Sequence, residues 1–79
     1  MRIRKLLGMK VLDVDANHIG KIDDIEFNSD TGEIEKIVVS LKKNIFSNDE
    51  MVIHYKNIKS IGDYVLLKVN FHQEWGVLD

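Results

Sequence analysis

Hydrophobic and polar residues alternate along most of the chain, and β-branched residues are enriched at the hydrophobic positions. Clusters of Gly, Asn, Asp and Ser interrupt this alternation at short intervals. Alternation with a period of two, bounded by such clusters, is typical of short strands joined by tight turns. The pattern predicts an all-β fold with strands at residues 10–14, 19–28, 33–41, 51–55 and 64–69.

The alternation shifts by one residue at two places in the predicted central hairpin. One shift lies between Ile22 and Ile25, and the other puts Ile34 out of phase with Ile37. A one-residue shift is what a β-bulge or a strongly coiled strand produces. The pattern holds five or six short strands, and the shifts favour a closed, mainly antiparallel barrel of six strands over a flat sheet or a sandwich.

The turns and the chain end complete this prediction. Asn28 and Asp30 suit a type I turn, and Gly32 can supply the positive φ that a following bulge needs. Ile58 and Ile61 have helical spacing, which predicts a single helical turn or a tight corner. Residues 71–79 lose the alternation and are expected to form a tail or a short helix. We expect one domain over residues 1–79, with the barrel at about residues 3–70.

Length and composition limit what the chain can be. With 79 residues, 44% of them hydrophobic, it has room for one small core, and small domains are often stabilised by self-association. Cysteine is absent, which excludes disulfides, thiolate metal sites and cysteine nucleophiles. The basic N-terminus is interrupted by Gly8 and Lys10, so its apolar run is too short for a signal peptide or a membrane span. We expect a cytoplasmic protein.

The charge balance argues against general nucleic-acid binding. Eleven Lys and Arg residues against thirteen Asp and Glu residues give a formal net charge of −2. Direct contact with RNA is still an alternative. It would rest on the basic side chains Arg2, Arg4, Lys5, Lys42, Lys43, Lys56 and Lys59.

The segment from Asp13 to Asp24 has the spacing of a calcium loop, with Asp13, Asp15 and Asn17 on alternate positions. Such a loop needs Gly at its sixth position and a bidentate Glu at its twelfth, but His18 and Asp24 stand there. The flanks alternate like strands, whereas a calcium loop joins two helices. We therefore expect a turn in which Asp15 and Asn17 cap local backbone groups.

No other constellation indicates catalysis or a bound cofactor. Asp23 and Asp24 are neighbours on a strand, so their carboxylates point to opposite faces unless a bulge redirects one of them. The three His residues lie far apart in sequence and lack the spacing of metal ligands. We expect no enzyme activity, no metal site and no cofactor.

Two segments carry apolar side chains that could contact a partner. Ile45 and Phe46 lie in the longest polar interruption, where they either fold back on the barrel or bind another protein. Phe71, Trp75 and Leu78 would align on one face of a helical tail. For the tail we favour docking across a dimer interface, where Trp and Phe are enriched.

Taken together, two stretches resemble the PRC-barrel family. They are "LLGMKVLDVDANHIGKIDDIEFNSDTGEIEKIVVSL" and "MVIHYKNIKSIGDYVLLKV", and the likeness covers about residues 3–70. The resemblance implies a six-stranded barrel that serves as a protein-interaction module. The family includes a domain of the photosynthetic reaction-centre H subunit, a domain of a bacterial ribosome maturation factor, and stand-alone archaeal proteins of this length. This chain departs from the pattern at His54, where many relatives have proline.

These observations lead to two main hypotheses. The first is a non-catalytic adaptor that forms a homodimer and binds an unidentified protein. The alternative is an RNA-linked role in ribosome maturation or RNA processing, through a ribosomal protein or direct RNA contact. Metal binding by the acidic turn is a third and weaker hypothesis.

Overall fold

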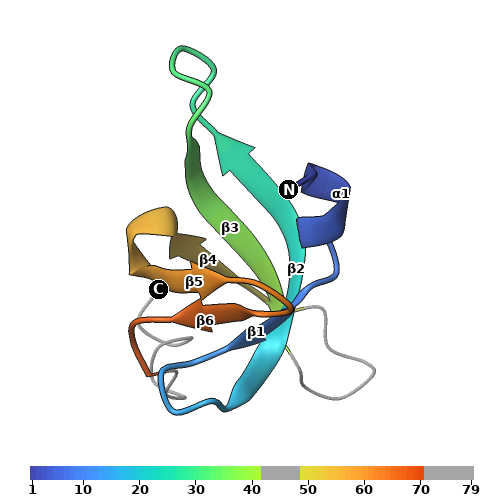
Figure 1. Cartoon of the computed structure of the whole chain (residues 1–79), viewed down its shortest axis with the longest axis vertical. Coiled ribbons are helices and arrows are strands. Elements are labelled where there is room, and N and C mark those ends of the chain that lie inside the picture. Colours follow the sequence, from blue (N-terminus) through green and yellow to red (C-terminus); the bar gives the residue numbers. More distant parts are fainter. Residues whose placement is uncertain (42–48, 71–79) are drawn as a thin grey trace.

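The computed structural model describes residues 1–41 and 49–70, which form one six-stranded sheet and two short helical segments (Figure 1). The elements are α1 (Ile3–Leu6), β1 (Lys10–Leu12), β2 (His18–Phe27), β3 (Ile34–Leu41), β4 (Glu50–His54), the 3₁₀ turn η1 (Tyr55–Asn57), β5 (Ile58–Ile61) and β6 (Val65–Leu67). This confirms the all-β class, and the bounds of the long central strands differ from the prediction by one residue.

The strand order in the sheet is β4-β3-β2-β1-β6-β5. Every neighbouring pair is antiparallel except β1 and β6, which run parallel. The prediction of a mainly antiparallel arrangement is therefore confirmed, with one parallel pair as the exception. The sheet is mixed because β1 and β6, the first and last strands of the described residues, lie side by side and run in the same direction.

The sheet is strongly rolled, but hydrogen bonds do not close it. Strands β4 and β5 occupy opposite ends of the strand order, yet only the three-residue turn η1 separates them in sequence. The two edges must therefore approach each other at one corner. Among the described residues, no ladder joins β4 to β5, so the expected closed barrel is corrected to an open, rolled sheet.

One hydrophobic core fills the inside of this roll. Its buried residues come from α1 and from β1, β2, β3, β4 and β6: Leu6, Val11, Ile19, Ile22, Ile37, Val39, Met51, Ile53, Val65 and Leu67. Ile58 and Ile61 of β5 pack against this cluster. Because alternate residues of a strand point to opposite faces, the intervening side chains lie on the outer face of the sheet.

The predicted shifts of the central hairpin are β-bulges. Ile22 pairs with Val39 but Asp24 pairs with Val38, which leaves Asp23 as the extra residue. A second irregularity lies between Glu26 and Phe27, and on the facing strand it leaves Glu35 without an opposite residue. Bulges increase the local twist and coil of a strand, which allows the long β2–β3 hairpin to bend across the roll and project beyond it (Figure 1).

The hairpin turn also follows the prediction. The Asn28 side-chain oxygen accepts hydrogen bonds from the backbone N–H groups of Asp30 and Thr31, at 2.8 and 3.2 Å. Gly32 has φ +78° and donates its N–H to the Asn28 carbonyl. A residue without Cβ takes this left-handed conformation at little cost, so the turn depends on glycine here.

The corner between β4 and β5 differs from the prediction. The helical turn is Tyr55–Asn57, and Ile58–Ile61 is a strand rather than a helical turn. Tyr55 is exposed, so it does not continue the inward face of Met51 and Ile53. The helix α1 was not predicted, because four residues are too few to show helical periodicity.

Candidate interaction surface

The segment that resembles a calcium loop is a turn between β1 and β2. Asp13 is almost fully buried, and its Oδ1 accepts hydrogen bonds from the N–H groups of Asp15 (2.9 Å) and Asn17 (2.8 Å). Its Oδ2 accepts a third from the Asn17 side-chain amide, at 3.2 Å. Ala16 has φ +66°. The predicted turn is confirmed, but the side chain that accepts the backbone hydrogen bonds is that of Asp13 rather than that of Asp15 or Asn17.

An acidic cluster lies on the outer face where β2 bulges. Asp23 is the extra residue of this bulge, and its carboxylate lies within hydrogen-bonding reach of Glu50 at the start of β4. This contact raises the pKa of Glu50 above its ordinary value, with desolvation and the negative charges of Asp23 and Asp24 adding to the effect. The bulge was predictable from the shift in alternation, but its contact with Glu50, across β3, was not. Within the described residues, no group of three or more His, Asp or Glu side chains has a geometry that could hold a metal ion.

A row of polar side chains crosses the outer face beside this cluster. Lys10 pairs with Lys21, Lys21 with Ser40, and Ser40 with Glu50, so the row runs from β1 to β4. It is cationic at one end and acidic at the other. Two lysines directly opposite each other on neighbouring strands repel. Such a surface offers contacts of both signs to a partner.

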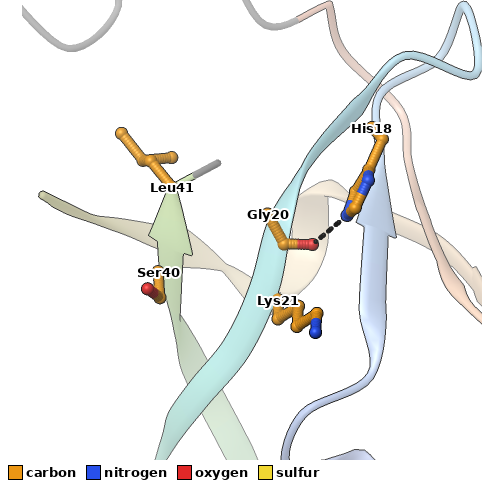
Figure 2. Close-up of a pocket in the computed structure, with 5 residues that line it drawn as sticks. All are labelled: His18, Gly20, Lys21, Ser40 and Leu41. Carbon is orange, nitrogen blue, oxygen red and sulfur yellow. Dashed lines mark hydrogen bonds between the residues drawn. The ribbon is translucent and has the colours of Figure 1, made fainter. Parts of the chain in front are cut away.

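A shallow hollow of about 390 Å³ lies beside this row. It is lined by His18, Gly20, Lys21, Ser40 and Leu41 (Figure 2). Figure 2 shows the His18 ring turned toward the Gly20 carbonyl, whose oxygen is 3.1 Å from Nε2. Gly20 allows β2 to lie close to β3 at this point. A Cβ on Gly20 would collide with the Ser40 carbonyl oxygen and press on the Val39 side chain.

Several large apolar side chains are exposed on the same molecule. They are Met1, Ile3, Leu7, Val14, Phe27, Val52, Tyr55 and Tyr64. Val52 is half exposed at the centre of β4, and Val38 lies next to it on β3. Large exposed apolar side chains are common at contact surfaces, but a single one does not identify a binding site.

All five residues predicted to bind a partner lie outside the described residues. They are Ile45, Phe46, Phe71, Trp75 and Leu78. The described part of the chain instead brings Asp23 close to Glu50 on the outer face, where Val52 of the same strand is also exposed. The sequence singled out Asp23 but neither Glu50 nor Val52. In that same part of the chain, no helix is long and apolar enough to cross a membrane.

The family model of the PRC-barrel domain matches residues 1–71. The chain belongs to the PRC-barrel family. None of the curated proteins compared with it matches its sequence. Among solved structures, the fold is similar to a putative 16S ribosomal RNA processing protein RimM from Pseudomonas aeruginosa, with a TM-score of 0.63 and 19% identity.

The similarity to RimM covers 85% of this PRC-barrel chain but only 42% of the RimM chain. At this identity the likeness shows a shared fold. The PRC-barrel pattern also accommodates His54, because His54 has φ −67° and ψ 142°, which lie within the range of proline. The departure from proline therefore leaves the corner before η1 in the geometry that proline would give it.

Proposed function

We propose that this PRC-barrel chain is a non-catalytic interaction module that pairs with itself and with at least one other protein. The observation that carries the proposal is the outer face of β1–β4, which presents a charged row, the acidic bulge and half-exposed Val52 side by side. Mixed charge around an apolar centre suits recognition of a folded surface. Family membership supports the same role.

The chemistry of the hollow is consistent with a binding surface rather than an active site. Ser40 lies on the exposed face, and the neighbouring His18 ring is directed at the Gly20 carbonyl instead of the Ser40 hydroxyl (Figure 2). A serine nucleophile needs a base within hydrogen-bonding reach. We propose a cytoplasmic location for the module, in keeping with its cysteine-free composition.

Affinity capture from the native cell tests this function. The tagged chain is compared with a charge-reversed variant, Lys21→Glu with Asp24→Lys, which alters the outer face and leaves the core untouched. We expect a small set of proteins to be captured by the native chain and lost with the variant. Capture that is identical for both would contradict the use of this face.

A second candidate function is a role in ribosome maturation, which one observation favours: the similarity in fold to a structure described as a 16S ribosomal RNA processing protein. In this role the chain would contact a ribosomal protein, or RNA through Arg2, Arg4 and Lys5. Ribonuclease treatment before capture separates these routes, because protein contacts survive it and RNA-bridged contacts do not. Binding to RNA that weakens steeply with salt would indicate direct phosphate contact.

A further inference from the structure

Strand β4 forms one end of the sheet, and its register decides which backbone groups point outward. The Leu41 N–H donates to the Asp49 carbonyl (2.9 Å), and the pairing continues through Ser40 with Glu50 and Val38 with Val52. In an antiparallel ladder only alternate residues exchange hydrogen bonds. The N–H and C=O groups of Glu50, Val52 and His54 therefore point away from β3.

The same three residues also carry the exposed side chains of β4. Met51 and Ile53 are buried in the core, whereas Val52 is 50% exposed, and Glu50 and His54 are also exposed. In the strand order of the described residues, no strand lies on the outer side of β4. Within the described residues, this edge thus presents three backbone positions that pair with no other strand, together with an acid, an apolar residue and an imidazole. Such an edge is a template for pairing with another strand.

The order of these side chains is complementary to itself. If two β4 strands run antiparallel about a two-fold axis at Val52, Val52 faces its own copy and Glu50 faces His54 of the second copy. The outward backbone groups then meet as hydrogen-bonded pairs at all three positions. Sliding the strands by two residues loses one pair and places Glu50 opposite Val52. Only the register centred on Val52 satisfies every position.

We propose that two copies of the chain pair antiparallel through their β4 edges, about a two-fold axis at Val52. The proposal rests on the proposed interaction role and names its first partner, a second copy, and the surface used. The two sheets become continuous, with both outer faces on one side. Glu50 lies beside Asp23 and Asp24, so the imidazole of the second copy offers a donor where negative charge gathers. Five-residue strands bury little area, so the dimer should be weak and should depend on concentration.

Sedimentation equilibrium across a wide range of protein concentrations tests the proposal. Glu50→Lys places a cation opposite His54 of the second copy, and His54→Glu places two carboxylates opposite each other. Each change acts twice in a symmetric dimer, so we expect the dissociation constant to rise at least about tenfold. The double variant exchanges the charges and should recover most of the wild-type affinity. Asp63→Lys, an equal charge change in the exposed loop before β6, is the matched control and should change little.

A backbone variant gives a second, independent readout. His54 already has the φ of proline, and its N–H points away from β3, so His54→Pro should fold with an unchanged circular dichroism spectrum. It removes an intermolecular donor and should weaken the dimer. Single charge variants that dimerise normally, or a double variant that does not recover, would overturn the register. A monomeric wild type at all concentrations would overturn the pairing, while capture of another protein would still leave the interaction role standing.

Discussion

Asp13 shows how one carboxylate can determine a turn. Both of its oxygens are engaged by the segment Asp15–Asn17, and the group is almost fully buried. We expect Asp13→Ala to lower the free energy of unfolding by about 1–3 kcal/mol, because partly buried N–H groups lose their acceptor. Asp15→Ala is the control, since the Asp15 side chain is exposed. Urea unfolding measures both, and equal effects would contradict the role of Asp13.

Gly20 is required for a different reason, the close approach of two strands. A methyl group there would meet the Ser40 carbonyl oxygen, which is backbone and cannot rotate away. Gly20→Ala should therefore cost about 1–3 kcal/mol of stability. At Gly62 an added Cβ meets nothing within 4 Å, so Gly62→Ala should be neutral or slightly stabilising. Thermal unfolding of the two variants measures this difference in stability. An equal loss of stability at both sites would contradict the prediction.

Some of these local features could be predicted from the sequence and others could not. Asn28 and Gly32 were predicted correctly because each residue type has a strong conformational preference at its place in the turn. Asp13, Asp15 and Asn17 are all good acceptors for a local turn, so composition cannot tell which one is turned inward. Gly20 has no local signal in the sequence, because the need for glycine there comes from the close approach of β3, twenty residues away.

At the scale of elements, the bulge in β2 links the fold to the surface. Asp23 is the extra residue of the bulge and lies near Glu50, and this contact raises the pKa of Glu50. The shift in alternation predicts a bulge at Asp23 and Asp24, so the sequence could indicate that one of the two carboxylates is redirected. It could not indicate that Glu50 is the neighbour, because this requires knowledge of how β3 pairs with β4. Long-range strand pairing leaves no trace in the periodicity of either strand.

The raised pKa of Glu50 gives stability a predictable pH dependence. The folded state binds this proton more tightly than the unfolded chain does. The stability that it contributes is therefore present below the ordinary glutamate pKa and is lost as the pH rises through the raised value. Glu50→Gln should flatten this fall at pH values above the ordinary glutamate pKa, relative to the wild type. Chemical unfolding in dilute solution measures this dependence of stability on pH, with Glu33→Gln on the hairpin as control. A slope unaltered by Glu50→Gln would show that the cluster is not coupled to folding.

At the scale of the whole molecule, one core joins nearly every element. Val39 of β3 belongs to this core and has no exposed surface. Val39→Ala should reduce stability by about 1–3 kcal/mol. Because no second core exists in the described part of the chain, unfolding should stay a single transition. Circular dichroism and the methyl NMR signals of Ile22 should report the same midpoint, and separate midpoints would contradict a single cooperative unit.

The parallel pairing of β1 with β6 has a consequence for how the chain acquires its shape. Val11 lies opposite Val65, so this side of β1 gains its neighbour only after β6, more than fifty residues later in the sequence, has been made. Until then, a nascent chain can form the hairpins of β2, β3 and β4 but leaves one side of β1 unpaired. Closing such a distant contact is slow compared with forming a hairpin. The growing polypeptide therefore passes through a stage in which apolar strand surface is open to other chains, and this stage ends only when β6 takes its place beside β1.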